Sequence, residues 1–471
     1  MSALASVQRA RQNVLMTSLP GSHGVGQKRL NSSKWRWVPP EWNKDPNKEL
    51  KKKLKDSQLK GGSSPSLQAV PVGDGQGSNR PKVPPRFHTL PPVQLKHPLF
   101  QSENRPDLHL APFQPDLVKP ISLNKALQFE SGHRTLLTAY GVPRNILHEF
   151  RILSKPCSLV REVTLSTTKW LDGAATQPSS AKRAVITGQL GSGKSYLLLQ
   201  AVEYARKKGY LVLYIPRSLR LVDSSSAYVY DPRTRTYLQP EFSAELLKRF
   251  RDVNLQAFEE LLTSEDVIIS GRRMIPKGTT LAELVRNGTR QEVDAPVVLS
   301  ALVKELQLQS KYPVVLAIDD FQSLYSQSKY RDARFNTLKA YHLSLPRLLL
   351  EFASGRQKFQ SGAVLGALTT ANSEFRVPLE LQEALGLTPD VPSGPYIRRK
   401  PELVEYAKGL QNIALPSQMS IAEAAALYEL WGKEKVLNDA PTDQTFLRLY
   451  TESAGNPRDF VWKGVMGSFS T

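Results

Sequence analysis

The chain has 471 residues, enough to bury a large hydrophobic core, and a formal net charge of +20 at pH 7. It contains no run of eighteen apolar residues, so no transmembrane helix is expected. A single cysteine, Cys157, excludes an internal disulfide and a cysteine-rich zinc site, and it suits a reducing compartment. We expect Cys157 to be a small packed residue rather than a catalytic thiol. The positive charge favours association with a polyanion.

The basic excess lies mainly at the N-terminal end of the chain. Residues 1–100 carry 17 Lys and Arg against 5 Asp and Glu, and residues 1–40 contain no acidic residue. A basic, serine-containing and acid-free segment without a long apolar core is typical of a mitochondrial targeting segment. A plain basic arm is the alternative. Residues 1–40 therefore predict import into the mitochondrial matrix.

Residues 41–125 predict an extended, proline-rich basic arm. Of the 34 prolines, 17 fall before residue 150, and a basic cluster occupies residues 51–55. Such a segment cannot bury enough apolar surface to fold alone, so we expect it to order only on a partner. Trp35, Trp37 and Trp42 lie among basic residues and suit stacking on nucleic-acid bases or docking into a protein. A solvated charged tail is the alternative.

The globular part is predicted to begin near residue 126, with a helical lead-in from about 145 to 172. Residues 183–187 are typical of a short buried strand, and residues 195–208 predict a helix with Gly209 as its C-cap. Between them the sequence matches G-x-x-x-x-G-K-[ST] without a mismatch, and this order of strand, loop and helix makes a phosphate site. The predicted nucleotide contacts are Gly188, Gln189, Leu190, Gly191, Ser192, Gly193, Lys194, Ser195 and Tyr196.

The residue types of this loop suit a nucleotide bound with Mg²⁺. Glycines let successive backbone N–H groups turn around an anion, and the helix N-terminus adds a favourable field. Lys194 would reach the β- and γ-phosphates, and the hydroxyl of Ser195 would bind Mg²⁺. An ordinary glycine-rich turn is the alternative, and the flanking strand and helix argue against it.

A second strand end carries two carboxylates. The patterns predict a strand at 211–215, helices at 243–262 and 296–308, and strands at 314–318 and 363–368. The aliphatic strand at 314–318 is followed directly by Asp319 and Asp320. Ligands of open α/β sheets bind at the carboxyl ends of the strands, so Asp319 is the predicted second ligand of Mg²⁺, directly or through water. An ordinary strand end is the alternative for this motif taken alone.

Two more positions are candidates for contact with the phosphates. Polar residues follow the strand at 363–368, and Asn372 among them occupies the place where P-loop ATPases carry a sensor residue. A strand-ending polar turn is the alternative. Residues 400–471 are predicted to form a helical region, in which Arg458 follows a Gly-Asn-Pro sequence like the second sensor of AAA+ ATPases. A capped turn with a solvated arginine is the alternative there.

Four further segments carry a family likeness, namely residues 216–226, 228–240, 320–325 and 330–332. Together with the motifs above, they make residues 125–465 similar to the death-associated-protein family of mitochondrial small-subunit ribosomal proteins. The resemblance implies a P-loop NTPase fold close to AAA+ and STAND ATPases. It also implies a place in the head of the small ribosomal subunit, near the contact with the large subunit, with rRNA and ribosomal proteins as partners. Family members are described as GTP-binding, with a reported role in programmed cell death.

Catalysis is a separate question from binding. AAA+ motors place Glu directly after the Mg²⁺-binding Asp, and this chain has the shorter Asp320, a doubtful water-orienting carboxylate. No arginine finger is assignable, so slow or absent hydrolysis is expected. No Asn-Lys-x-Asp follows the loop, so the choice between GTP or GDP and ATP stays open. An active AAA+ or STAND-like ATPase or GTPase, acting on nucleic acid or as a signalling switch, is the alternative.

The predicted organisation therefore has four parts. A targeting segment at 1–40 and an arm at 41–125 precede an α/β domain at 126–399, and a helical, lid-like region occupies 400–471. The α/β domain is predicted to be an AAA+-like P-loop NTPase with a parallel sheet flanked by helices. It would bind a purine nucleoside di- or triphosphate with Mg²⁺.

Overall fold

The computed structural model describes residues 108–467, except 133–134, 271–272, 389–393, 395, 435–436 and 438–440. The predicted targeting segment and most of the predicted arm lie outside the described residues. Within the described part of the chain, no helix is long and apolar enough to cross a membrane.

A five-stranded, all-parallel sheet forms the centre of the fold, in the order β13-β3-β12-β9-β4. Its strands are β3 (Arg183–Thr187), β4 (Leu211–Ile215), β9 (Val314–Ile318), β12 (Gly362–Ala367) and β13 (Gln411–Ala414). Nearly every residue of β3, β4, β9 and β12 is buried, because helices cover both faces, and such strands consist of continuous aliphatic runs. The predicted α/β class with a central parallel sheet is confirmed.

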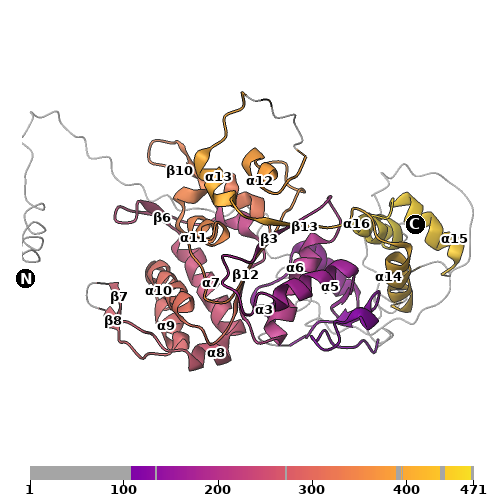
Figure 1. Cartoon of the computed structure of the whole chain (residues 1–471), viewed down its shortest axis with the longest axis horizontal. Helices are drawn as coiled ribbons and strands as arrows, with labels where there is room; N and C mark the ends of the chain where they lie inside the picture. Colours follow the sequence, from indigo (N-terminus) through magenta and orange to yellow (C-terminus); the bar gives the residue numbers. More distant parts are fainter. Residues whose placement is uncertain are drawn as a thin grey trace, which may run out of the picture. The chain divides into compact units, whose positions relative to one another are not determined.

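Helices pack on the two faces of this sheet. Figure 1 shows α5 and α6 on one side of the strands and α7, α10 and α11 on the other. These helices are α5 (Glu162–Asp172), α6 (Lys194–Lys207), α7 (Pro240–Val253), α10 (Ala295–Leu308) and α11 (Ser344–Ala353). The predicted helix at 195–208 is confirmed within one residue at each end. Its C-cap is Lys208, and Gly209 follows in the left-handed region with φ 84°.

The single helix predicted at 243–262 is in fact two helices. α7 ends at Val253, and α8 (Leu255–Glu260) follows after Asn254. The Asn254 side chain accepts a hydrogen bond from Val212 N and donates one to Val212 O, both at 2.8 Å. Because β4 is an edge strand, these bonds satisfy backbone groups that have no strand partner. The break between α7 and α8 therefore places the Asn254 side chain where it bonds the free backbone groups of the edge strand β4.

The predicted helical lead-in is interrupted by a strand. α4 (Arg144–Ile152) and α5 flank β2 (Cys157–Leu159), which pairs antiparallel with β1 (Ala126–Gln128). The packed part of the chain also begins earlier than residue 126. Phe113 is 1% exposed, its ring centroid lies 5.3 Å from that of Phe129, and its N–H donates to Gln128 O at 2.7 Å. A single buried aromatic residue anchors a segment whose composition alone resembles that of the arm.

The C-terminal region is not purely helical. It begins with α13 (Pro401–Ala407) and β13, which extends the central sheet beside β3, so the part outside the sheet starts after Leu415. It continues with α14 (Ile421–Lys433), α15 (Asp443–Glu452), α16 (Pro457–Asp459) and the π-helix η10 (Phe460–Val465). These helices share a second hydrophobic cluster with Leu153 and Cys157. Burial raises the pKa of the Cys157 thiol to about 12, which fits the predicted packed role.

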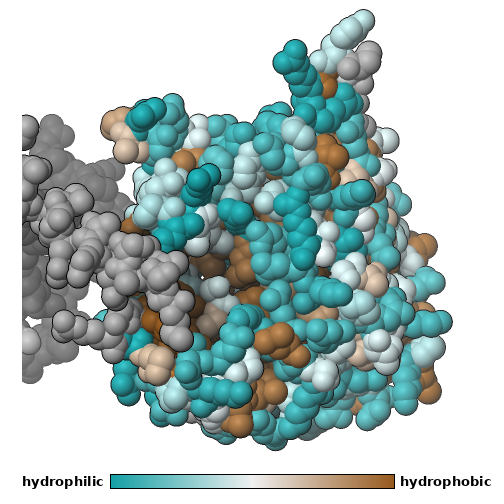
Figure 2. Space-filling view, turned by 60° about the vertical axis from the view of Figure 1, so that its left-hand side comes forward, coloured by the Kyte–Doolittle hydropathy of each residue, from teal (hydrophilic) through white to brown (hydrophobic). Residues whose placement is uncertain are grey.

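Short hairpins and short helices lie outside the central sheet. Three antiparallel hairpins are β5 (Val229–Asp231) with β6 (Thr236–Leu238), β7 (Val267–Ser270) with β8 (Arg273–Ile275), and β10 (Gln327–Arg331) with β11 (Thr337–Lys339). Further short α-helices in the described part of the chain are α3 (Leu136–Ala139), α9 (Leu281–Gly288) and α12 (Leu379–Ala384). The face shown in Figure 2 is mostly hydrophilic, with hydrophobic residues scattered over it.

Candidate functional site

The carboxyl ends of the parallel strands bring the predicted site residues to one edge of the sheet. β12 pairs with both β3 and β9, so it lies between the strand that leads into Gly188 and the strand that leads into Asp319. Thr369 follows β12 at the same edge. Residues that are far apart in the sequence therefore meet where open α/β sheets bind their ligands.

Residues 188–195, called the glycine loop below, have the backbone that the motif predicts. Gly188, Gly191 and Gly193 have φ values of 148°, 85° and 97°, a region that residues with a side chain rarely adopt. A Cβ on Gly191 would lie 2.4 Å from Oδ1 of Asn456, so packing also requires glycine there. Gly193 is the N-cap of α6, and the free N–H groups of the first helical turn face the loop.

Lys194 is folded back onto its own loop. Its Nζ donates to Gly188 O at 2.8 Å and to Gln189 O at 2.6 Å. Burial lowers the pKa of Lys194 to about 8, and the nearby Asp319 carboxylate opposes that effect. The side chain is thus a buried ammonium group whose present partners are neutral carbonyl oxygens. An anionic partner would match it better, because hydrogen bonds between ions are stronger.

The two carboxylates at the end of β9 are buried together. Asp319 is 2% exposed and accepts a hydrogen bond from the N–H of Asp320 at 2.9 Å, and the nearby Ser195 hydroxyl favours its ionised form. Burial raises the pKa of Asp319, and the charge of Asp320 raises it further. Asp320 has a left-handed backbone with φ 57°, and burial raises its pKa while the nearby Thr369 side chain opposes that shift. A cation bound between Ser195 and Asp319 would relieve this repulsion.

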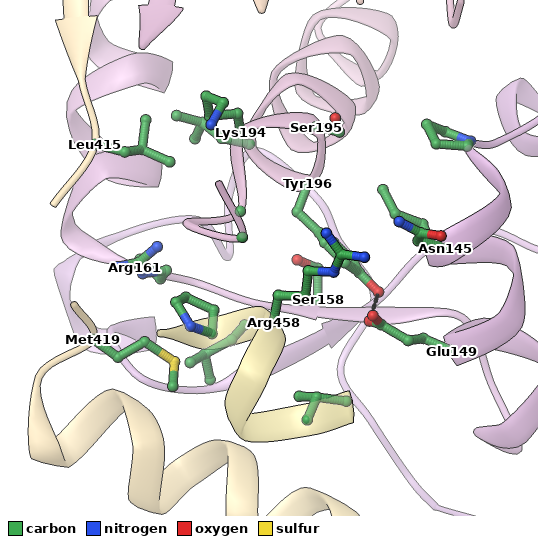
Figure 3. A pocket seen from close by; sticks show the side chains of 18 of the residues that line it. Asn145, Glu149, Ser158, Arg161, Lys194, Ser195, Tyr196, Leu415, Met419 and Arg458 are labelled. Atoms are coloured by element: carbon green, nitrogen blue, oxygen red, sulfur yellow. Dashed lines mark hydrogen bonds between the residues drawn. The ribbon is translucent and has the colours of Figure 1, made fainter. Parts of the chain in front are cut away.

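A cavity of about 240 Å³ opens beside the loop (Figure 3). It is bounded by α4 and the segment up to α5, by the glycine loop, by the residues after β12, and by the C-terminal helices. Of the predicted nucleotide contacts, those that line it are Leu190, Gly191, Gly193, Lys194, Ser195, Tyr196 and Arg458. Gly188, Gln189, Ser192 and Asn372 are not among its lining residues. Asn372 Oδ1 instead accepts from Glu374 N at 3.0 Å, while Thr369 and Thr370 line the cavity.

The C-terminal region contacts the glycine loop directly. The N–H of Arg458 donates to Gly191 O at 3.1 Å, and Asn456 Nδ2 donates to Leu190 O at 2.8 Å. Asn456 also caps α16, because its Oδ1 accepts from the N–H groups of Arg458 and Asp459. Figure 3 shows the Arg458 side chain extending from this helix towards Tyr196 and Glu149. The predicted Arg458 therefore lies at the cavity, and its neighbour Asn456 supplies the contact with the loop.

Arg161 is a site residue that no sequence motif predicts. Its Nη1 donates to Ser192 O at 3.0 Å, and its Nε lies 3.1 Å from Oε1 of Glu423. Glu423 in turn forms a capping box with Ser420 at the start of α14. The Ser-x-x-Glu spacing of that box is visible in the sequence, whereas nothing in the sequence pairs it with Arg161.

A buried carboxylate joins three elements at the far side of the cavity. Glu149 of α4 accepts hydrogen bonds from the Tyr196 hydroxyl of α6 and, at 2.7 Å, from Trp462 Nε1 of η10. Burial raises the pKa of Glu149, and these two hydrogen bonds oppose the shift. The tyrosine after Ser195 is thus engaged in holding the lead-in, the core and the C-terminal helices together.

The donor set fits a phosphate-bearing ligand that brings oxygen atoms of its own. Lys194, Arg161 and Arg458 surround the cavity with positive charge. The buried Oγ of Ser192 has no hydrogen-bond partner among the described residues, which leaves one hydroxyl of the loop unsatisfied. No group of three or more His, Cys, Asp or Glu in the described ranges suits a metal ion held by protein alone. Mg²⁺ commonly has one or two protein ligands and completes its coordination shell with phosphate and water oxygens. Ser195 and Asp319 can provide the protein ligands.

Comparisons with known proteins agree with the family resemblance. The family model for mitochondrial ribosomal death-associated protein 3 matches residues 158–462. The chain is similar to the small ribosomal subunit protein mS29 of Neurospora crassa, with 28% identity over 61% of this chain and 62% of that protein. It is also similar to mS29 of Schizosaccharomyces pombe, with 24% identity over 80% of this chain and 82% of that protein, and to mS29 of Mus musculus, with 22% identity over 50% and 61%. The match thus spans less than two thirds of the Neurospora and mouse proteins.

Proposed function

This chain belongs to the mitochondrial ribosomal death-associated protein 3 family, and from that premise we propose that it is a structural component of the mitochondrial small ribosomal subunit. The relatives are small ribosomal subunit proteins by name. The strongly basic composition supports rRNA and ribosomal proteins as partners. The acid-free segment 1–40 agrees with a location on the mitochondrial ribosome in the matrix. A contact with the large subunit is part of the same proposal.

The protein also carries a purine nucleotide with Mg²⁺ at the glycine loop. One observation carries this proposal. The buried Lys194 lies at the N-terminus of α6, close to the Asp319 carboxylate, and the backbone of the glycine loop surrounds it. With nucleotide bound, Lys194 would exchange two carbonyl partners for phosphate oxygens. Ser195 and Asp319 would hold Mg²⁺, which neutralises phosphate charge. The apolar lining from Ile146, Leu159 and Val461 suits a flat base.

Hydrolysis is slow or absent in this proposal. A water-orienting carboxylate must reach its water, and Asp320 has a shorter side chain than Glu on a left-handed backbone. The bound nucleotide then acts as a structural ligand, whose stabilisation of the folded state grows with the logarithm of the free nucleotide concentration above its Kd. Phosphate release under multiple-turnover conditions measures this directly. A rate of about 1 s⁻¹ or more would instead indicate a working phosphoryl-transfer enzyme.

Two measurements on the native protein separate the two halves of the proposal. In a sucrose gradient of mitochondrial lysate, the protein should sediment with the small ribosomal subunit. Nucleotide extracted from the immunopurified protein should include a purine di- or triphosphate, and it should be absent from Lys194→Ala protein. A protein that stays at the top of the gradient contradicts the ribosomal assignment. A ribosomal protein without nucleotide contradicts the ligand alone.

A further inference from the structure

Two of the hairpins combine into a basic and aromatic surface outside the nucleotide cavity. The hairpins β5–β6 and β10–β11 contain six Lys and Arg against two Asp. The basic side chains are exposed and are Arg233, Arg235, Lys329, Arg331, Arg334 and Lys339. Figure 1 shows β6 and β10 next to each other, and Figure 2 shows a mainly hydrophilic surface on the face it presents. We call these two hairpins the paired hairpins.

Tyrosine side chains connect the paired hairpins to each other. The Tyr228 hydroxyl donates to the carbonyl of Arg331, and the Tyr228 ring lies 5.0 Å from that of Tyr330 and 5.7 Å from that of Tyr237, edge to face. The buried Tyr330 hydroxyl also lies 3.1 Å from Ser226 Oγ. Such ring pairs restrict both strands, so the two hairpin tips keep a fixed spacing. A fixed surface loses little entropy when it binds.

The two acids of the hairpins are used internally. Asp231 accepts hydrogen bonds from Arg233 N and Thr234 Oγ1, and Asp332 accepts from Arg334 N and Asn336 N. These bonds lower the pKa of both carboxyls, so both stay ionised while they cap the turns. Arg235, Arg331 and Arg334 have no ion pair among the described residues. They are therefore available to an anion from outside.

The tips also present strained residues to solvent. Arg235 and Phe335 have φ values of 53° and 64°, which are costly for residues with large side chains. Phe335 is 78% exposed, so burial does not offset this cost. Tyr230 is half exposed nearby on β5. An exposed aromatic ring held in an unfavourable backbone next to unpaired arginines indicates a surface that is built for a partner.

We infer that the paired hairpins dock a single-stranded segment of RNA. Arginines that are free of ion pairs bind phosphates, and exposed aromatic rings stack on unpaired bases, which is the usual pairing of contacts for single-stranded RNA. An acidic protein segment would also use the arginines and bury an aromatic ring, so the test below includes such a segment as the contrary outcome. This surface lies outside the lining of the nucleotide cavity, so it is a second binding surface that does not depend on the proposed nucleotide.

The test uses the full-length protein and fluorescence anisotropy with a labelled single-stranded RNA of mixed sequence and about 20 nucleotides. Arg235→Gln, Arg331→Gln and Arg334→Gln are combined in one variant. Affinity should fall about tenfold or more, and the slope of log K against log salt should drop by about 2, since each single-strand phosphate contact contributes about 0.7. The matched control combines Lys277→Gln, Arg286→Gln and Arg290→Gln, which removes the same charge from exposed positions around α9.

Phe335→Asn separates stacking from charge. Asn tolerates the left-handed backbone, so this variant should be at least as stable as the parent protein to heat, yet bind the RNA about fivefold or more weakly, with an unchanged salt slope. Equal losses in the hairpin and control triple variants would overturn the inference, because binding would then depend on overall charge. Tight binding of a labelled poly-glutamate peptide that needs the same arginines, without loss in Phe335→Asn, would overturn it in favour of a protein partner.

Discussion

The glycine loop and the C-terminal helices that cover it are held in different ways. The loop is rooted in the sheet, because β3 lies between β12 and β13 and most of α6 is buried in the main core. The C-terminal helices belong to the second cluster, which is anchored on Leu153 and Cys157 of the lead-in. Their contacts with the loop are polar, through Asn456, Arg458 and the Arg161–Glu423 pair.

Because of this difference, the glycine loop and the C-terminal helices should respond differently to a ligand in the cavity. Dense apolar packing fixes one arrangement, whereas a few hydrogen bonds exchange readily with water or ligand at a net cost of about 1 kcal/mol each. The loop should therefore keep its shape with or without nucleotide. The C-terminal helices should respond to what occupies the cavity. Substitutions at Lys194, Asp319, Arg161 and Asn456, with their matched controls, test this contrast in order of decreasing expected effect.

The loop side should supply most of the affinity. Lys194→Ala removes the buried ammonium group, and nucleotide affinity should fall about 100-fold, since hydrogen bonds between charged groups contribute roughly 1.5–3 kcal/mol. Equilibrium binding of a fluorescent nucleotide measures the loss. Lys207→Ala, on the exposed end of the same helix, is the control and should bind normally. If Lys194→Ala binds as tightly as the parent protein, the loop is not the site.

Asp319→Asn should weaken nucleotide binding less but abolish its dependence on Mg²⁺. Titrations with Mg²⁺ and with EDTA should coincide for the variant and differ for the parent protein. Without metal, the variant should also be the more stable protein. The pKa of Asp319 is raised in the folded state, so the parent loses stability as pH rises through that range and the variant does not. The loss falls between the ordinary pKa of an Asp and the raised pKa of about 7, so thermal melts in EDTA from about pH 4 to pH 8 check the sign. A variant that is less stable than the parent at the top of this range contradicts it.

The sequence predicted the loop side well and the covering side poorly, for one physical reason. Local patterns determine a strand, a glycine turn and a helix, so residues 183–187 and Lys194 were placed without tertiary information. Whether Asn372 or Thr369 faces the carboxylates depends on how the chain turns after β12, which composition does not decide. Four residues of strand in β13 were missed because a short, mostly exposed edge strand has no strong pattern.

Arg161 is a further site residue that the sequence alone could not predict. Its partners, Ser192 and Glu423, are 31 and 262 positions away, and one arginine among many carries no signal of its own. Arg458, predicted as a phosphate contact from its likeness to the second sensor of AAA+ ATPases, lines the cavity, and its contact with phosphate stays a prediction. Long-range polar pairs are therefore the part of this site that requires a structure.

Arg161→Ala should release the C-terminal helices and lower nucleotide affinity about tenfold, because one charged hydrogen bond contributes roughly 1.5–3 kcal/mol. Limited proteolysis after α14 should become faster, while the melting of the main core changes little. Glu423→Gln is the matched variant, since Gln keeps the capping box of α14 but loses the ion pair. It should show the faster proteolysis with a smaller loss of affinity. Identical behaviour of both variants would mean that Arg161 acts through the C-terminal helices alone.

Asn456 should give the smallest and most discriminating effect. Asn456→Ser keeps an N-cap for α16, because a serine hydroxyl accepts from the same N–H groups, but it loses the bond from Nδ2 to Leu190 O. One neutral hydrogen bond corresponds to roughly 0.5–1.5 kcal/mol, so nucleotide affinity should fall about threefold. Asn456→Ala removes cap and bond together, so the difference between the two variants isolates the cap, and the loss in Asn456→Ser relative to the parent measures the contact with the loop. Amide hydrogen exchange on α16 supplies the structural readout. Exchange should rise in the alanine variant and stay near the parent level in the serine variant, because only the cap holds the helix itself.

If the serine variant loses as much affinity as the alanine variant with normal exchange, the bond to Leu190 carries the coupling. If it loses none, the C-terminal helices are held at the loop by Arg161 and by the backbone of Arg458 alone.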